Sequence, residues 1–240
     1  PSVSFWDCGE FIAASVSLQV PHPPGTPFFL LLGNIFSKLP IGENLGFRVN
    51  MISVLSSALS ILLLYLIAVK LIENYKGKKA DNMFDAVSTY VAAAIGALAF
   101  SFSDTFWFNG VEAEVYAFST FLFAAVTYLI IRWNERADNK DSEKYILMIA
   151  YLIGLATGVH LMSVLAAVPV VMIIMFKKYV NDEESLKKTG YIFIGHAVII
   201  LLLAVFWWSS QKSQTPPSVE EYKDFDTKFK LFVVGISALI

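Results

Sequence analysis

The sequence predicts an all-α protein, a polytopic bundle of transmembrane helices. Hydrophobic residues make up 56% of its 240 residues. Charged residues make up 16%, whereas a soluble domain carries about 25%. Uncharged runs that are long enough to cross about 30 Å of hydrocarbon recur along the chain. We therefore expect about six to seven spans, together with a short interfacial helix near the N-terminus.

The N-terminal segment, residues 1–48, comes first, and we expect it to lie outside the bilayer. Asp7 and Glu10 are three residues apart, so they share one face if the segment is helical. Prolines at positions 21, 23, 24 and 27 end that helix and hold His22 in an extended turn. The apolar stretch Phe28 to Leu39 is too short to span a bilayer, so it is the predicted interfacial helix.

The longer apolar runs that follow are the predicted spans. They lie at Val49 to Val69, Ala86 to Ser103, Val115 to Ile131, Tyr145 to Phe176 and Gly190 to Gln211, and a further span opens at Leu231. The fourth run has 32 residues. As one helix it would be about 48 Å long, too long for a single crossing without steep tilt. We expect it to break near Gly158 into two short helices.

These elements are predicted to form a single transmembrane domain over residues 1–240. Its parts are an outer loop with the acidic motif at 1–48, transmembrane helices over 49–211, an outer loop or short interfacial helix at 212–230, and the start of a further span at 231–240. The chain begins at Pro1 and ends inside an apolar run, so we expect it to be a piece of a longer protein.

Positive charge predicts the orientation of the spans, because cytoplasmic loops collect Lys and Arg. Twelve of the 18 Lys and Arg residues lie in three segments, 70–79, 132–144 and 177–188. We expect these segments to face the cytoplasm and the acidic motif to face outward. Short loops and the absence of any Asn-x-Ser/Thr sequon favour a bacterial cytoplasmic membrane over the endoplasmic reticulum. The net charge of −2 gives no indication of a nucleic-acid partner.

The candidate site residues are acids without a basic neighbour in the sequence. Asp7, Glu10, Glu112 and Glu114 lie among apolar residues, whereas half of the 20 acids lie in the three predicted cytoplasmic loops, 70–85, 132–144 and 177–189, mixed with Lys and Arg. Acids placed in this way near a membrane are functional candidates. The alternative is that acids gather outside only because basic residues gather inside. The single cysteine, Cys8, is predicted to be a small buried residue, and it excludes an internal disulfide.

Five motifs carry a resemblance to a known family. They are WDCGE (6–10), PHPPG (21–25), FRVN (47–50), EAEVY (112–116) and GVHL (158–161). Their order resembles the first outer loop and following helices of the GT-C superfamily of glycosyltransferases, multi-span enzymes that use polyprenyl-phosphate-linked sugars. Within it, the motifs are most similar to bacterial membrane proteins of unknown function that are related to a eukaryotic protein O-mannosyltransferase. In such enzymes a transmembrane helix precedes the acidic loop, so we expect one to precede Pro1 in the longer protein.

The resemblance implies an inverting glycosyltransferase that moves a monosaccharide, with mannose as the expected sugar, from a polyprenyl phosphate to a hydroxyl of an exported protein or glycan. A lipid phosphate is a good leaving group, so a single carboxylate acting as base on the acceptor is sufficient. The resemblance places that base in the first outer loop, where Asp7 is the first choice and Glu10 the second. Limited access to water would raise the pKa of either carboxyl toward neutrality.

Five further residues are predicted to bind substrate. Arg48 stands at the outer end of a long apolar helix, where its guanidinium either grips the donor phosphate or extends to the lipid headgroups. His22 and His160 bind phosphate or acceptor, or are structural histidines. Glu112 and Glu114 bind sugar hydroxyls or cap a helix start. All of these residues must meet around one cavity at the outer membrane boundary.

No cofactor and no metal are predicted, although Asp7 with Glu10 is able to hold a divalent ion. The expected partners are the lipid bilayer, the lipid-linked sugar donor and the exported acceptor. The competing function is a proton-coupled transporter or flippase, in which Glu112, Glu114, His160 and His196 would relay protons or bind the transported molecule. A structural membrane subunit is the third alternative.

Overall fold

The computed structural model describes residues 3, 6–23, 25–209 and 219–237, and within them the fold is helical without any strand. The chain divides into two compact units, Pro1–Ile173 and Ile174–Ile240. The helices are α1 (Cys8–Ser17), α2 (Pro27–Ser37), α3 (Leu45–Lys76), α4 (Met83–Ser101), α5 (Asp104–Gly110), α6 (Val115–Asn134), α7 (Glu143–Thr157), the 3-10 helix η1 (Leu161–Ala166), α8 (Ala167–Tyr179), α9 (Glu183–Ser209) and α10 (Val219–Ser237). The predicted all-α class is confirmed.

Four helices in the described part of the chain are long and apolar enough to cross a membrane, namely α3, α4, α6 and α9. The short apolar helix predicted after the proline turn is present as α2, which begins with Pro27 at its first turn. The 32-residue run breaks as predicted, because α7 ends at Thr157 and α8 begins at Ala167. The prediction of a single domain stays a prediction.

The C-terminal unit differs from the expectation in one respect. Residues 219–230, which we predicted as an outer loop or a short interfacial helix, form the first part of the longer helix α10. Their charges pair along the helix, with Lys228 bonded to Asp224 and Lys230 to Asp226. Residues 210–218 and 238–240 lie outside the described residues, so the rest of the predicted outer loop and the end of the last span are not described.

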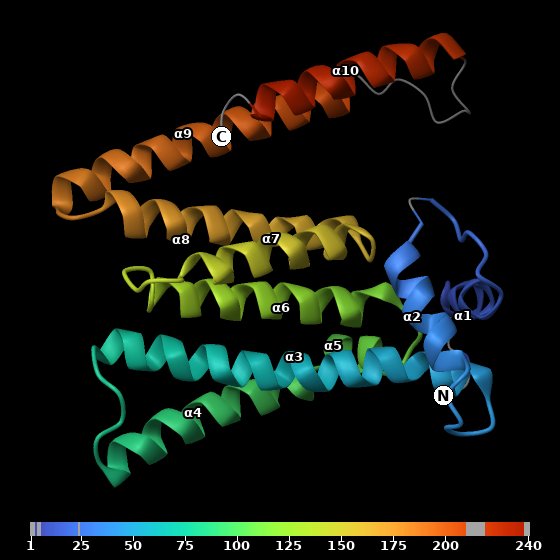
Figure 1. The fold of residues 1–240 in the computed structure, drawn as a ribbon, viewed down its shortest axis with the longest axis horizontal. Coiled ribbons are helices and arrows are strands. Elements are labelled where there is room, and N and C mark those ends of the chain that lie inside the picture. Colours follow the sequence, from blue (N-terminus) through green and yellow to red (C-terminus); the bar gives the residue numbers. More distant parts are fainter. Residues whose placement is uncertain (1–2, 4–5, 24, 210–218, 238–240) are drawn as a thin grey trace. The chain divides into compact units, whose positions relative to one another are not determined.

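The first unit is organised around α3 and α6, which pack side by side and run in the same direction (Figure 1). Near their starts, the Ser53 hydroxyl of α3 lies 3.4 Å from the Glu114 carbonyl oxygen that precedes α6. At their ends, Lys70 of α3 pairs with Glu135 just after α6. Any group held at one end of this pair is therefore about a bilayer thickness, roughly 30 Å, from a group at the other end.

Helix α3 buries small polar residues and exposes large apolar ones. Ser53, Ser56, Ser57 and Ser60 are buried, and a methyl group added to Gly110 of α5 would lie 3.0 Å from the Ser57 hydroxyl oxygen. Leucines at positions 55, 59 and 62 are exposed instead. Lipid is as apolar as leucine, so helices in a membrane associate through close packing of small residues. This inverted pattern is typical of a helix that spans a bilayer.

A hydrophobic core fixes α1 and α2 over the starts of α3 and α6. It contains buried residues of α1, α2, α3 and α6 and of the end of α7: Phe11, Ala14, Phe29, Leu30, Ile52, Val115, Phe118, Leu122, Ala156 and Val159. The rings of Phe11 and Phe29 meet edge to face with centroids 5.8 Å apart, a favourable aromatic geometry. The N-terminal segment is therefore a packed part of the bundle rather than a loose arm.

Candidate active site

Asp7, Glu10 and His22 form a cluster at the start of α1. The backbone N–H of His22 donates to Glu10 Oε1 at 2.7 Å, and the His22 Nδ1 atom lies 2.9 Å from Glu10 Oε2. The His22 Nε2 atom faces Asp7 Oδ2 at 4.0 Å. Asp7 and His22 are about half exposed, so the open side of this cluster is accessible from outside the protein.

The pairing with Glu10 changes the proton affinities of both partners. The hydrogen bond from His22 holds the pKa of the Glu10 carboxyl below its usual value, and the same bond raises the pKa of the His22 imidazole. The charges of Asp7 and Glu114 raise the His22 pKa further. Our expectation of a raised pKa at Glu10 was therefore wrong, because its hydrogen bonds to His22 stabilise the ionised form.

Glu112 and Glu114 form a buried layer beneath α1, in contrast to the exposed cluster. Both side chains are almost fully buried, and the Cys8 thiol lies 3.7 Å from a carboxylate oxygen of each. Burial raises the pKa of Glu114 to about 7, and the neighbouring charges of Glu112 and Asp7 contribute to the rise. The near-neutral carboxyl that we expected in the first outer loop is thus found at Glu114.

The two layers form one electrostatic unit, because the charges of Asp7 and Glu114 influence each other and His22. We call the set Asp7, Glu10, His22, Glu112 and Glu114 the acidic end. Cys8, predicted to be a small buried residue, is completely buried between its two layers. The cysteine is therefore the physical link between the N-terminal motif and the motif at 112–116.

The segment that carries Glu112 and Glu114 is held by polar residues of α3. The Asn50 side-chain amide donates to the Val111 carbonyl oxygen at 3.3 Å. Ala113 packs without any exposure against Ile12 of α1 and Val49 of α3. Asn50 and Ser53 were missed as positioning residues, although the available signal was two polar side chains near the start of an otherwise apolar run.

The turn that carries His22 is fixed from both sides. Leu18, which ends α1, adopts a left-handed conformation with φ of 51°, and the His22 ring packs against Phe11 with centroids 5.7 Å apart. The Asn34 amide of α2 donates to the carbonyl oxygens of Ser15 and Val16 at 3.0 and 3.1 Å. Trp6, directly before Asp7, has a φ of 61°, a strained value for a bulky residue and one that is found often at functional sites.

His160 lies beside the acidic end through Tyr116, in the first turn of α6. The two rings have centroids 5.4 Å apart. The Phe28 backbone N–H at the start of α2 donates to the Gly158 carbonyl oxygen at 2.8 Å, which ties the turn before His160 to the N-terminal segment. The GVHL motif is therefore adjacent to the EAEVY motif, as a common cavity would require.

Arg48 is placed differently from the other predicted residues. Its guanidinium donates to the carbonyl oxygens of Ser37 at 3.0 Å, Ile41 at 3.1 Å and Gly42 at 3.0 Å, all in the connection between α2 and α3. These bonds use three of the five N–H donors of the guanidinium. The structure thus gives Arg48 a stabilising contact with that connection, and its phosphate-binding role stays a prediction.

The exposed cluster has the ligand types for a divalent cation. Asp7, Glu10 and His22 each offer one ligand atom, and these atoms lie within 4.8 Å of one another. Carboxylate and imidazole ligands together suit several divalent metals. The sequence predicts no metal here, and that prediction stays untested.

A family comparison places this geometry in a known context. Residues 7–183 match the profile described as "Protein O-mannosyl-transferase TMEM260 N-terminal domain". The chain belongs to this family. The matched segment begins at Asp7 and includes every residue that we predicted for the site.

Two curated relatives show how far the similarity extends. The chain is 26% identical over 188 residues to protein O-mannosyl-transferase tmem260 of Dictyostelium discoideum, an alignment covering 73% of the chain and 21% of that protein. It is 28% identical over 151 residues to protein O-mannosyl-transferase TMEM260 of Mus musculus, covering 62% of the chain and 19% of that protein. The chain thus spans about a fifth of the length of these relatives. No solved structure gives a significant match.

Proposed function

We propose that this chain is the membrane-embedded catalytic part of a GT-C-type mannosyltransferase that uses a polyprenyl-phosphate donor and a hydroxyl of an exported protein or glycan as acceptor. One observation carries the proposal. In a chain of the O-mannosyl-transferase family, an accessible carboxylate, Asp7, lies 4.0 Å from an imidazole whose pKa is raised. A base and a cation side by side are what transfer from a lipid phosphate requires.

Asp7 is the better candidate for the base. Both carboxylate oxygens of Glu10 are engaged by His22, whereas the Asp7 side chain is 55% exposed. In the proposed step the acceptor oxygen attacks C1 of mannose as its proton passes to Asp7. The bond from C1 to the phosphate oxygen breaks, and the lipid phosphate leaves with the electron pair. Attack opposite the leaving group inverts the configuration at C1.

His22 is the cation that would face the departing phosphate. The hydrogen bond with Glu10 keeps the His22 imidazole protonated to higher pH, and the imidazolium then has its Nε2–H available on the side of Asp7. Arg48, predicted for this task, already donates to three carbonyl oxygens. We therefore assign the first phosphate contact to His22 rather than to Arg48.

Glu112, Glu114 and His160 are proposed to bind the sugar. A carboxyl with a pKa of about 7 is partly protonated at neutral pH, so Glu114 is able to donate as well as accept a hydrogen bond. Sugar hydroxyls require both. The proposed orientation puts the acidic end on the outer side of a bacterial cytoplasmic membrane, because the Lys- and Arg-rich ends of the helices are expected inside.

The experiment compares Asp7→Asn with Asp104→Asn in membranes that contain the protein. Asp104 is an exposed aspartate in the first turn of α5, outside the acidic end. We expect Asp7→Asn to lower mannose transfer from polyprenyl-phosphate mannose about 100-fold or more, because the base is lost, and Asp104→Asn to retain it. Equal transfer by wild type and Asp7→Asn would remove Asp7 from the mechanism. Proton-driven uptake into proteoliposomes without any transfer would favour the transporter.

A further inference from the structure

A cleft lies between the ends of α3 and α6, opposite the acidic end. It encloses about 700 Å³ and is lined by residues of α3, the turn after it, the end of α6 and the loop after it: Lys70, Glu73, Asn74, Gly77, Lys78, Lys79, Arg132, Glu135, Arg136 and Asn139. Five of these side chains are cationic and two are anionic. The cleft shares no residue with the acidic end, and the proposed transfer makes no use of it.

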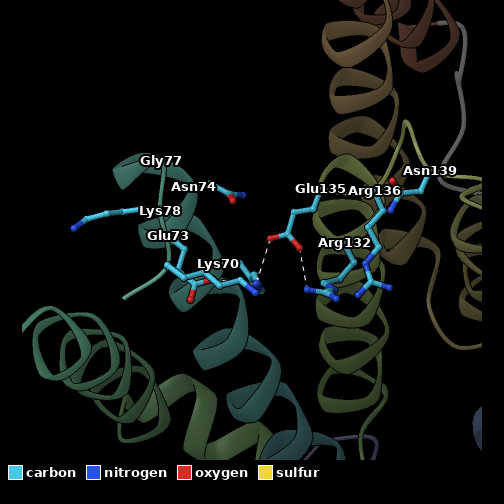
Figure 2. A pocket seen from close by; sticks show the side chains of 10 residues that line it. Lys70, Glu73, Asn74, Gly77, Lys78, Arg132, Glu135, Arg136 and Asn139 are labelled. Atoms are coloured by element: carbon cyan, nitrogen blue, oxygen red, sulfur yellow. Dashed lines mark hydrogen bonds and ion pairs between the residues drawn. The ribbon is translucent and has the colours of Figure 1, made fainter. Parts of the chain in front are cut away.

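The floor of the cleft is an ordered network of ion pairs. Lys70 lies 3.0 Å from Glu73 and 3.4 Å from Glu135, and Arg132 lies 2.9 Å from Glu135. Figure 2 shows Lys70 and Arg132 approaching Glu135 from the two helices. Both carboxylates of the cleft are thus already neutralised by Lys70 and Arg132. The remaining cations exceed what the protein's own acids in the cleft require.

The remaining cations form the rim. Arg136 donates one guanidinium N–H to the Tyr145 hydroxyl, a neutral partner, so its charge is not compensated by that bond. Within the described residues Lys79 has no ion pair, while Lys78 lies 2.8 Å from Asp81 outside the cleft. The carbonyl ends of the two helices contribute only about half a negative charge each. The cleft therefore retains a net positive charge beyond that needed to stabilise the helix ends.

We propose that this cleft binds a phosphate group, supplied by the headgroup of an anionic phospholipid or by free phosphate. The cleft occurs where two spans end, at the level where headgroup phosphates lie. Basic pockets between helix ends are suited to anionic headgroups, because Lys and Arg supply both charge and several N–H donors. Arg136 and Lys79 make the phosphate contacts. The ion pairs of Glu135 with Lys70 and Arg132 join the two walls of the cleft, α3 and α6, at a fixed spacing.

The test measures the thermal midpoint of the purified protein in neutral detergent during titration with phosphatidylglycerol, phosphatidylcholine or inorganic phosphate. We expect saturable stabilisation by phosphatidylglycerol and none by phosphatidylcholine. If inorganic phosphate stabilises equally, the free anion is the ligand; if it has no effect, the lipid headgroup is. Absence of stabilisation by both anionic probes would overturn the proposal.

Matched variants locate the effect. Lys79→Gln/Arg136→Gln should raise the phosphatidylglycerol concentration at half-saturation about 30-fold, because each basic residue near an anionic surface contributes about a factor of five in affinity. Asn139→Asp, which adds one negative charge with little change in size, should raise that concentration about fivefold. The control Lys187→Gln/Lys188→Gln removes two charges from α9, outside the cleft, and should change it less than about twofold. Equal weakening by the control and the cleft variant would show non-specific attraction and refute the site.

Discussion

The two ends of the α3 and α6 pair differ in how their carboxylates are surrounded. At the acidic end, Glu112 and Glu114 are buried next to a thiol and a third carboxylate, and the pKa of Glu114 rises to about 7. At the other end, which carries the basic cleft and which we call the basic end, both carboxylates of the cleft, Glu73 and Glu135, are paired with a cation. Burying the Glu114 carboxyl beside other carboxylates is unfavourable for stability, which favours a functional role for it, whereas the ion pairs of the basic end contribute to holding the helices together.

The largest expected effect tests the stabilising role of the basic end. Lys70→Met leaves Glu73 and Glu135 without their shared cation, and we expect it to lower the free energy of unfolding by about 3 kcal/mol, measured in mild detergent. Lys70→Met/Glu73→Met also removes the carboxylate that Lys70→Met leaves without a cation, and Glu135 keeps its ion pair with Arg132. It should recover a substantial part of the loss. A loss for the single variant below about 0.5 kcal/mol would place this network among ordinary surface ion pairs.

The next effect concerns the paired part of the acidic end. Glu10→Gln removes the carboxylate that raises the His22 pKa, so the imidazole should lose its proton at lower pH. We expect transfer to fall about tenfold near pH 8, with little change near pH 6. The measurement is the pH profile of kcat/KM. A uniform fall at every pH would mean that Glu10 positions the turn without tuning His22.

The same pair predicts a pH window for the stability of the His22 turn. His22 has a raised pKa in the fold, so its contribution is complete below its unfolded value and is lost as pH rises through the raised one. Glu10 has a lowered pKa, so its contribution is lost as pH falls through that lowered value. The amide-exchange protection factors of residues 18–20 and 22, which are corrected for the intrinsic pH dependence of exchange, should therefore be largest between these limits in wild type and lose that dependence in Glu10→Gln.

A smaller effect separates the two roles of Arg48. Lysine keeps the charge but cannot reach the carbonyl oxygens of Ser37, Ile41 and Gly42 together, so Arg48→Lys should cost about 1–2 kcal/mol of stability. Its KM for the lipid-linked donor should change less than about threefold. A KM that rises about tenfold or more, with unchanged stability, would restore Arg48 as a phosphate ligand.

The smallest effect has the opposite sign. The Glu114 carboxyl has a raised pKa in the fold, so its ionisation destabilises the protein as pH rises from its ordinary value of 4.5 through about 7. Glu114→Gln should raise the melting temperature by about 2–4 °C near pH 8 and have less effect near pH 5. Ser53→Ala, which changes a neighbouring uncharged group, should show no such pH dependence. A destabilised Glu114→Gln at high pH would mean that its hydrogen bonds outweigh its charge.

The sequence predicted the elements of this fold better than their contacts. The break near Gly158 and the short helix after the prolines followed from length and from proline chemistry, both of which are local. The contacts of Arg48 were not predictable, because a snorkelling, a phosphate-binding and a carbonyl-binding arginine leave the same signature at a helix start. The link from Cys8 to Glu112 and Glu114 joins residues more than 100 positions apart, which no local pattern encodes.

The buried serines of α3 have a consequence for how the protein is made. Helix α3 packs against its neighbours through small polar residues and close backbone approach. This association does not depend on the hydrophobic effect, so each helix is able to insert into the bilayer before the helices pack together. Glu112 and Glu114 reach the underside of α1 only when α6 docks. The acidic end is therefore complete only after α6 has been synthesised and has packed against α3.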